Sequence, residues 1–558
     1  MTDLLGRLSV PGFDASSYIS KNKNNLSSLP NVALAFSGGG YRATLNGGGA
    51  LRSFDSREQN ATAAGHLGGL LQSATYIAGL SGGGWLVGSI YVNNFTTISA
   101  LQESPKGSVW GFGNSILQGP ESGGIDAINT GEYFDDLFND VGDKKDAGFE
   151  TSLTDYWGRG LSYQLVNASN GGPSYTWSSI QLQDSFSSAD APMPILVADG
   201  RAPGETLIPG TATVYEFNPF EFGSWDPTTF GFVPLEFLGS NFTGGDLVKG
   251  AKCVRGFDNV GYVMGTSSSL FNQFVLQVND SSVPKAAKTF ANKVLGAISQ
   301  DNNDIADYTP NPFLGYNTES NLNAQSQRLT MVDGGEDLEN LPLHPLIQPN
   351  RDVDVIFAVD SSADTDNYWP NGTSLVATYQ RSLNGTIANG TAFPAVPDTN
   401  SFVNLGLNTR PTFFGCNSSN TSSITPLVVY IPNFPYVFHS NISTFNLKYS
   451  NPTRDAVLEN GYNVATMGNA TVDPMWPTCV ACAILSRSME RTKTDVPDAC
   501  TQCFNKYCWD GSTSPGNPPA YEPAYKTDTV VKSASSDAFG VSRVLVAAAA
   551  GLLCWFIL

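Results

Sequence analysis

A serine surrounded by glycines is the first candidate for chemistry in this chain. Residues 79–85 read Gly-Leu-Ser-Gly-Gly-Gly-Trp, which places Ser81 in a Gly-x-Ser-x-Gly pattern directly after the strand-like run Ala74–Ala78. A serine on a tight turn between a strand and a helix exposes its hydroxyl, and small neighbours avoid a clash there. The dipole and free N–H groups of the following helix favour an oxyanion beside it. The pattern predicts Ser81 as a nucleophile, with Gly82 as one oxyanion donor.

A glycine-rich loop follows the short apolar run Val32–Phe36. Residues 37–43 read Ser-Gly-Gly-Gly-Tyr-Arg-Ala. Three glycines allow backbone amides to approach a ligand closely, so this loop can supply further oxyanion donors. The expected donors are Gly38, Gly39 and Gly40. Arg42, just inside the next helix, is placed to meet a phosphate or a carboxylate.

The same loop allows a competing interpretation. Gly38-x-Gly40-x-x-Ala43 after a strand also fits a dinucleotide-binding fingerprint, with Asp55 or Glu58 near the distance expected for an acid that binds ribose. A nucleotide-binding oxidoreductase therefore stays open as an alternative. It leaves the glycine-flanked serine unexplained.

An aspartate held by glycines completes the set. Residues 329–335 read Leu-Thr-Met-Val-Asp-Gly-Gly, an apolar run that ends in Asp333. At a strand end, this side chain can reach a nucleophile on an adjacent strand. We predict that Asp333 takes the Ser81 proton and then protonates the leaving alkoxide. Because carboxylates ionise at lower pH than imidazole, such a dyad predicts activity in acidic surroundings.

Histidine is the usual base for a catalytic serine, and the chain contains three: His66, His344 and His439. His344 and His439 follow Asp333, so a Ser–Asp–His order remains an alternative. Proline and apolar residues surround His344, and His439 follows an apolar run, which favours packing roles for both. An acidic limb of the pH–rate profile near about 6.5 would indicate a histidine base.

Together the three motifs resemble the catalytic domain of fungal lysophospholipases (phospholipase B), relatives of the cytosolic phospholipase and patatin-like group. The resemblance spans roughly residues 31–510. Further stretches that resemble the family are 353–356, 360–364, 369–372 and the cysteine-rich end from Trp476 to Trp509.

The resemblance implies specific roles and an activity. It makes Ser81 the nucleophile, Asp333 its partner and Arg42 a contact for substrate phosphate. The implied reaction is release of fatty acids from lysophospholipids, with diacyl phospholipids as further candidate substrates, and it requires no cofactor and no metal. A catalytically inactive surface glycoprotein on a hydrolase scaffold remains a second alternative.

The motif strands lie far apart in the chain without a linker between them. We therefore expect one large α/β unit with a central mixed sheet flanked by helices and with long insertions. The resemblance implies that this unit is of the patatin and cytosolic phospholipase type. The expected segments are a polar N-terminal stub (1–30), the catalytic domain (31–510) with its cysteine-rich extension (476–510), a Pro/Ser/Thr-rich stalk (511–543) and an apolar tail (544–558).

Composition indicates an extracellular setting. The formal net charge is -20 and only 14% of residues are charged, so Ser, Thr, Asn and attached sugars must supply much of the polar surface. Nucleic acid is disfavoured as a partner because its phosphates would be repelled. Thirteen Asn-x-Ser/Thr sequons suggest a glycoprotein.

The C-terminal end predicts a membrane anchor. Small residues around Ser533, a spacer and the apolar tail 544–558 together form a signal for a glycosylphosphatidylinositol (GPI) anchor, with Ser533 as the candidate attachment site. A membrane tail anchor is the alternative. Residues 1–30 contain no secretory signal, which conflicts with surface display, and we expect the N-terminus to be truncated.

Eight cysteines allow two interpretations. Cys479-x-x-Cys482 and Cys500-x-x-Cys503 match a four-thiolate zinc spacing. The predicted extracellular setting favours disulfides instead. The pairing stays open at this point.

Overall fold

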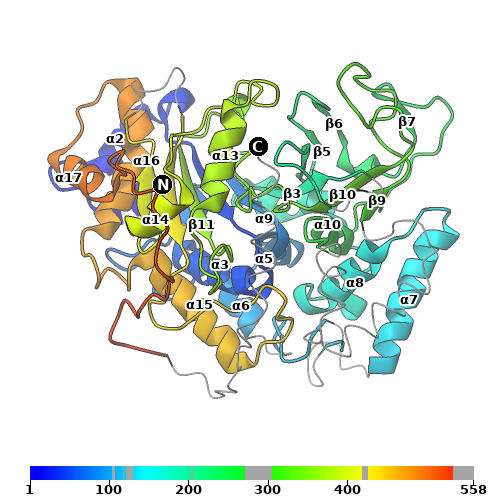
Figure 1. The fold of residues 1–558 in the computed structure, drawn as a ribbon, viewed down its shortest axis with the longest axis horizontal. Helices are drawn as coiled ribbons and strands as arrows, with labels where there is room; N and C mark the ends of the chain where they lie inside the picture. Colours follow the sequence, from blue (N-terminus) through cyan, green and yellow to red (C-terminus); the bar gives the residue numbers. More distant parts are fainter. Residues whose placement is uncertain are drawn as a thin grey trace.

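The computed structural model describes residues 1–103, 107–116, 118–120, 130–202, 205, 207–270, 305–417 and 425–531. Within them, one large mixed sheet with helices on both faces organises the chain (Figure 1). This arrangement confirms the predicted α/β class.

The main sheet contains parallel and antiparallel strands. Its strands are β1 (Val32–Phe36), β2 (Tyr76–Gly79), β3 (Met193–Gly200), β4 (Val214–Phe217), β5 (Glu221–Ser224), β6 (Gly231–Pro234), β9 (Ala306–Tyr308), β10 (Leu329–Asp333), β11 (Val355–Asp360), β12 (Thr412–Phe414) and β13 (Leu427–Pro432). They follow the order β12-β13-β11-β1-β2-β3-β4-β5-β6, and β10 joins β3 to β9. The central strands from β13 to β3 are parallel, and both edges are antiparallel. A separate hairpin comprises β7 (Phe242–Thr243) and β8 (Asp246–Leu247).

Helices precede, connect and follow these strands. The α-helices are α1 (Thr2–Leu8), α2 (Ala15–Asn22), α3 (Gly40–Phe54), α4 (Leu70–Ser73), α5 (Ser81–Val92), α6 (Ile98–Gln102), α7 (Thr130–Asp146), α8 (Leu153–Leu165), α9 (Asp184–Ser187), α10 (Val260–Thr266), α13 (Thr373–Leu383), α14 (Thr399–Asn404), α15 (Asn451–Thr466), α16 (Trp476–Thr492) and α17 (Asp498–Tyr507). Short 3-10 turns are η1 (Leu26–Ser28), η2 (Ser169–Gly171), η3 (Ser178–Leu182), η4 (Leu235–Phe237) and η5 (Pro349–Arg351).

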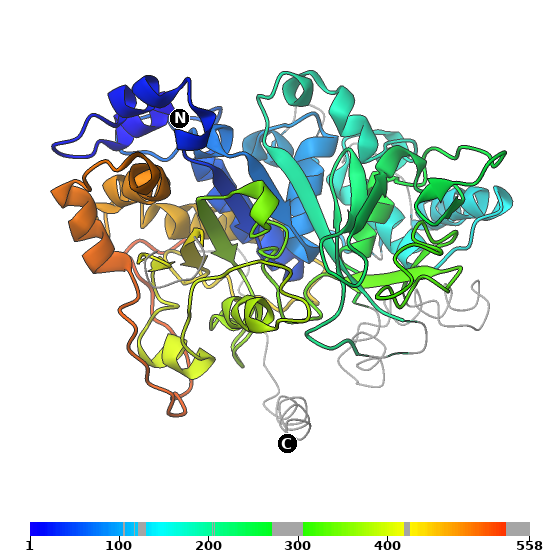
Figure 2. The same cartoon turned by 90° about the horizontal axis from the view of Figure 1, so that it is seen from above.

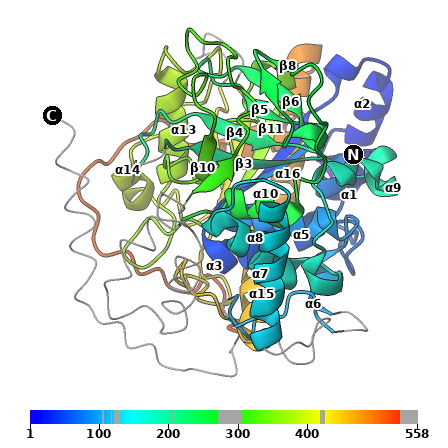
Figure 3. The ribbon, with the colours of Figure 1, turned by 90° about the vertical axis from the view of Figure 1, so that its right-hand side faces the viewer.

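The sheet separates two apolar layers. Side chains alternate between the faces of a strand, so Leu34 of β1 packs in one layer and Ala33 and Ala35 pack in the other. The first layer includes side chains from α3, α5, α8, α10, α15 and α16, and the second includes those from α13 and α14. Figure 3 shows α13 and α14 on one side of the strands and α3, α5, α8 and α10 on the other.

Two strands meet end to end along one edge of β3. Strand β2 is parallel to β3 and ends with Gly79 opposite Leu196. Strand β10 pairs with the same edge in the antiparallel sense and ends with Asp333 opposite Ala198, because β4 occupies the other edge. The carboxyl ends of β2 and β10 are therefore two residues, or about 7 Å, apart along β3.

The N-terminal segment 1–30 is not the polar stub that we expected. It forms α1, α2 and η1, and Leu4, Leu5 and Leu8 are buried in the main core. These helices lie beside α16 and α17 (Figure 2). The charged and polar residues of the segment hid this packing, because the apolar side chains of α1 all lie on one face.

The described part of the expected stalk lies along the body of the protein. Residues 511–531 contain no helix or strand, but the Asn404 side chain donates to the Ser514 carbonyl at 2.7 Å. Farther along, the Lys526 N–H donates to the Pro435 carbonyl and the Val531 N–H to the Val437 carbonyl, each at 2.8 Å. The sequence could not reveal these contacts, because backbone groups make most of them.

Three disulfides staple the cysteine-rich end, which confirms the disulfide interpretation over zinc. The bonds are Cys416–Cys508, Cys479–Cys503 and Cys482–Cys500, with Cα–Cα distances of 6.2, 5.1 and 5.2 Å. Cys253 is free and exposed. The two Cys-x-x-Cys pairs join α16 to α17.

None of the helices in the described ranges is long and apolar enough to cross a bilayer. Ser533 and the apolar tail 544–558 lie outside the described residues.

Candidate active site

Ser81 begins α5 on a sharp turn after β2. Its φ angle is 50°, in the left-handed region that non-glycine residues rarely adopt. Its N–H donates to the Ser267 carbonyl at 2.9 Å and to the Ser267 hydroxyl at 3.1 Å. The side chain is almost fully buried, at 4% exposure. This geometry is the strained strand-to-helix turn that the glycine pattern predicts.

Asp333 ends β10 and faces Ser81, as the abutting strands require. One carboxylate oxygen, Oδ1, accepts the Gly335 N–H at 2.9 Å. The other, Oδ2, is buried and has no well-formed hydrogen bond within the described residues. Burial raises the pKa of the Asp333 carboxyl to about 6, against the opposing effect of hydrogen bonding from the Ser81 hydroxyl and the Gly335 N–H.

This pKa corrects one expectation from the sequence. A carboxylate with an ordinary pKa would stay ionised well below the range of imidazole, but burial brings Asp333 close to that range. An acidic limb near pH 6 therefore fits the carboxylate as well as a histidine, so it no longer distinguishes the two bases.

A run of serines after α10 braces both catalytic candidates, and sequence reasoning missed it. The Ser267 carbonyl accepts the Gly334 N–H at 3.4 Å as well as that of Ser81, and the Ser269 carbonyl accepts the Asp333 N–H at 3.2 Å. The Ser267 hydroxyl donates to the Val197 carbonyl of β3 at 2.6 Å. The only signal in the sequence is a row of three serines after an apolar helix.

The glycine loop meets the nucleophile at the N-termini of two helices. A Cβ atom added to Gly38 would lie 2.9 Å from the Ser81 Cβ, and one added to Gly82 would lie 2.1 Å from the Gly40 carbonyl oxygen. Gly39 caps α3, Gly40 begins it, and Gly82 lies in the first turn of α5. Amides at such positions have no acceptor inside their helix.

Gly38 differs from the other predicted donors. Its N–H donates to the Asn340 carbonyl at 3.0 Å, and the Asn340 side-chain amide donates back to the Gly38 carbonyl at 3.3 Å. This amide is therefore engaged in holding the loop. The donors available for an oxyanion are those of Gly39, Gly40 and Gly82.

Arg42 lies beneath the glycine loop, where the predicted contact with substrate phosphate is not available. The side chain is 1% exposed. Its Nε donates to the Ser361 carbonyl at 2.8 Å, Nη1 to the Ile442 carbonyl, and Nη2 to the Thr444 hydroxyl at 3.1 Å. A Cβ atom on Gly39 would lie 2.5 Å from Nη2. The guanidinium therefore supports the loop from below.

All three histidines have their contacts away from the Ser81–Asp333 pair. His344 Nε2 faces Asp226 Oδ1 at 3.4 Å. His439 packs against the rings of Trp369 and Tyr525. His66 lies in the loop before α4, and its backbone N–H donates to the Ala63 carbonyl. The geometry thus favours the carboxylate as base.

The two acids that the dinucleotide interpretation needs for a ribose, Asp55 and Glu58, are already bonded to neighbouring groups. The Asp55 carboxylate pairs with Arg57 and also accepts from the Gln72 side chain. Glu58 accepts from the Ser99 backbone N–H at 3.0 Å and from its hydroxyl. Both acids therefore have partners within the protein, and the glycine loop faces Ser81, so the geometry does not favour a dinucleotide site.

Comparison with known proteins agrees with this geometry. A family model described as the lysophospholipase catalytic domain matches residues 32–514. The chain belongs to this family. The matched range nearly coincides with the 31–510 expected from the motifs.

Individual relatives cover most of the chain. It is 60% identical over 537 residues to "Lysophospholipase 1" of Aspergillus fumigatus, covering 96% of this chain and 84% of that protein. It is 48% identical over 500 residues to "Lysophospholipase 1" of Saccharomyces cerevisiae, covering 88% and 74%.

A solved structure shares the fold. Human GIVD cytosolic phospholipase A2 aligns with a TM-score of 0.63 and 15% identity, over 88% of this chain. The alignment covers 65% of the human chain, which is less than two thirds of its length.

Proposed function

We propose that this protein is a serine acyl-hydrolase that releases fatty acids from lysophospholipids through an acyl-Ser81 intermediate. The single observation that carries the proposal is the meeting of Ser81 and Asp333 at the abutting ends of β2 and β10. The names of the relatives supply the substrate class. Diacyl phospholipids are further candidate substrates.

In the acylation step, the ionised Asp333 takes the proton of the Ser81 hydroxyl as the serine oxygen attacks the ester carbonyl. The oxyanion that forms lies against the N–H groups of Gly39, Gly40 and Gly82 and the positive end of the α5 dipole. Asp333 then gives its proton to the departing glycerol oxygen. The products of this step are the acyl-serine ester and the deacylated glycerophosphodiester, which keeps its head group.

In the deacylation step, a water molecule attacks the acyl-Ser81 ester. Asp333 takes the water proton and returns a proton to the Ser81 oxygen, which releases the fatty acid. Since Asp333 must be ionised at the start of each step, its pKa of about 6 predicts loss of activity below that pH. A carboxyl with this pKa exchanges protons readily near neutral pH, which suits both roles.

The test removes each member of the pair separately. We expect Ser81→Ala to abolish hydrolysis of lysophosphatidylcholine and labelling by a fluorophosphonate probe, because the probe bonds to the serine oxygen. One solved structure of the human phospholipase is itself a complex with methyl γ-linolenyl fluorophosphonate. We expect Asp333→Asn to fold normally and to lower kcat by about a thousandfold or more. A Ser81→Ala protein that keeps full activity would overturn the proposal.

We also propose surface display of the enzyme as a glycoprotein with a GPI anchor at Ser533. The support is the C-terminal sequence pattern together with three disulfides, which are typical of oxidising compartments. The asparagines of eleven sequons lie within the described residues (all except Asn279 and Asn420), and each of the eleven is at least partly exposed. Phosphatidylinositol-specific phospholipase C should release an anchored enzyme from intact cells.

A further inference from the structure

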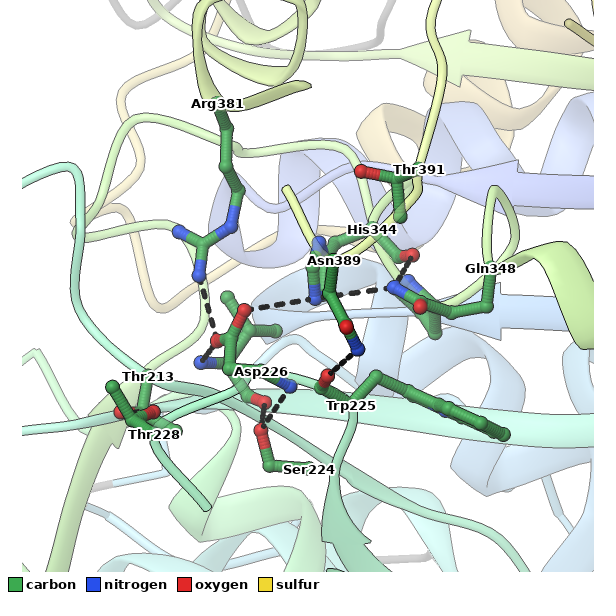
Figure 4. A network of polar contacts seen from close by, with 12 residues as sticks. Thr213, Ser224, Trp225, Asp226, Thr228, His344, Gln348, Arg381, Asn389 and Thr391 are labelled. Atoms are coloured by element: carbon green, nitrogen blue, oxygen red, sulfur yellow. Dashed lines mark hydrogen bonds and ion pairs between the residues drawn. The ribbon is translucent and has the colours of Figure 1, made fainter. Parts of the chain in front are cut away.

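A buried cluster of charges surrounds Arg381 behind the turn that carries Asp333. The guanidinium Nη2 pairs with Asp226 Oδ2 at 2.7 Å, Nη1 lies 3.7 Å from Asp337 Oδ2, and Nε lies 3.5 Å from Glu339 Oε2. Figure 4 shows Arg381 reaching Asp226 from one side while His344 approaches it from another. A fourth carboxylate, Asp199, accepts the Asp337 N–H at 3.3 Å.

The cluster joins three parts of the fold to the Asp333 turn. Arg381 comes from α13, Asp226 follows β5, and Asp199 belongs to β3. Asp337 and Glu339 lie four and six residues after Asp333, and the Glu339 N–H donates to Asp337 Oδ1 at 2.8 Å. Both ends of the turn are thus fixed: β10 holds the start, and the cluster holds the end.

The conformation of the turn is strained between the two anchored acids. Leu338 has a φ angle of 77°, and 52% of its side chain is exposed. A leucine in the left-handed region is an outlier that persists only where its surroundings impose it. Neighbours with buried, fixed side chains on either side supply that constraint.

Burying one arginine among several carboxylates costs free energy of folding, because each charge loses its hydration. Arg381, Asp226, Asp337 and Glu339 are each at most 4% exposed. Burial opposes ionisation of Asp226, but His344 and Arg381 outweigh it and lower the pKa of that carboxyl to about 2. Burial and mutual repulsion raise the pKa values of Asp199 and Asp337 well above the usual range. A protein with apolar residues of the same volume in these positions would often be equally stable, so a gain in stability does not explain the cluster.

We infer that Arg381 is a positioning residue for the catalytic step: it fixes the turn after β10 so that the Asp333 carboxylate stays aligned with Ser81 and shielded from water. The inference rests on the proposed function of Asp333. Arg381 touches neither the reacting atoms nor Asp333, and it acts through Asp337 and Glu339.

Loosening the turn has two measurable consequences. Misalignment of the base lowers kcat, because a displacement of about 1 Å can cost on the order of a hundredfold. Entry of water around Asp333 moves its pKa down from about 6 toward the ordinary value, since burial causes the rise. The titratable and charged groups around the turn are Asp199, Asp226, Asp337, Glu339, Arg381 and His344, and the charge of Asp333 itself acts on Asp199.

The test compares Arg381→Met with Arg487→Met. Arg487 lies on α16, is 1% exposed, and bonds to Glu490 and to backbone carbonyls, so its replacement removes a similarly buried guanidinium far along the chain from the turn. For Arg381→Met we expect kcat on a soluble short-chain ester to fall about 10- to 100-fold with KM within about twofold. The acidic limb should move down by about one pH unit. Arg381→Lys should recover part of the loss.

The control should lose stability but keep the kcat and the acidic limb of the parent enzyme. An Arg381→Met enzyme that loses only stability, as Arg487→Met does, would overturn the inference. If Arg381→Met does not fold, Glu339→Gln removes the contact between Arg381 and the Glu339 carboxylate with little change in shape. An unchanged kcat and pH profile in Glu339→Gln would also overturn the inference. Fluorophosphonate titration counts competent Ser81 sites, so failure of the Arg381 role is distinguishable from failure of the Ser81 assignment.

Discussion

Two buried arginines lie behind different parts of the proposed active site, and their contacts differ. Arg42 lies under the glycine loop and donates to two carbonyls and a hydroxyl, all of them neutral. Arg381 lies behind the Asp333 turn and faces three carboxylates. Burial lowers the pKa of Arg42, whereas the surrounding carboxylates outweigh burial and raise the pKa of Arg381.

The difference indicates how each side responds to its surroundings. The hydrogen-bond partners of Arg42 are carbonyls and a hydroxyl, which do not titrate, and Asp360 and Asp364 act on its charge through space. Arg381 instead pairs directly with carboxylates, and burial and repulsion raise the pKa of one of them, Asp337, well above the usual range. Protonation therefore acts directly on the contacts of Arg381 and only through space on Arg42.

The strongest way to break this comparison is Arg42→Met. We expect a loss of about a hundredfold in kcat/KM, because Gly39 and Gly40 lose the support beneath their amides. Since Arg42 is buried, the loss should be equal for lysophosphatidylcholine and for a neutral monoacylglycerol. The acidic limb should stay in place, in contrast to Arg381→Met. A loss confined to the phospholipid would restore the direct phosphate contact that the sequence suggested.

The pH dependence of stability sharpens the comparison with a smaller effect. Asp199, Asp337, Asp333 and Asp364 have folded pKa values above their unfolded ones, with Asp333 near 6 and Asp364 near 7. Their stabilisation is complete below about pH 3.9 and is lost as pH rises through those values. Asp226 acts in the opposite sense, and its contribution is lost as pH falls toward about 2.

Thermal unfolding should therefore show its highest midpoint near about pH 4 to 5, with a fall of about 5 °C by pH 8. The fall should be smaller in a Glu339→Gln, Asp337→Asn double variant, which removes part of the repulsion. A midpoint that rises steadily from pH 4 to pH 8 would contradict the raised pKa values of these buried carboxyls in the folded state.

The smallest expected effect comes from Thr444→Val. This change removes one acceptor of Arg42 and leaves the carbonyl partners in place. A single hydrogen bond to a charged group predicts a loss of about tenfold or less in kcat/KM, equal for charged and neutral substrates. If the loss matched that of Arg42→Met, the carbonyl contacts would contribute little to the support of the loop.

Sequence reasoning reached the parts of the site that local patterns encode. The glycine-flanked Ser81, the loop after β1 and the end of β10 each combine an apolar run with glycines, and the fold follows from the same runs. The partners of Arg42 and Arg381 could not be predicted, because they lie between about 40 and 400 residues away in the chain and no local pattern links them. The raised pKa of Asp333 depends on burial that no local pattern records.

Strand β3 sets the separation of Ser81 and Asp333. Strands β2 and β10, which lead to these residues, are registered against it. Loops elsewhere between Ser81 and Asp333 can therefore change in length without moving either group, provided that β3 and the run Ser267–Ser269 keep their positions. This tolerance is consistent with a shared fold at 15% identity. The same device has a weak point: a slip of β10 by one position would displace Asp333 by about 3.4 Å and turn its side chain to the opposite face. We therefore expect insertions to be tolerated in loops that contact neither residue, and to abolish activity within β2, β3, β10 or the run Ser267–Ser269.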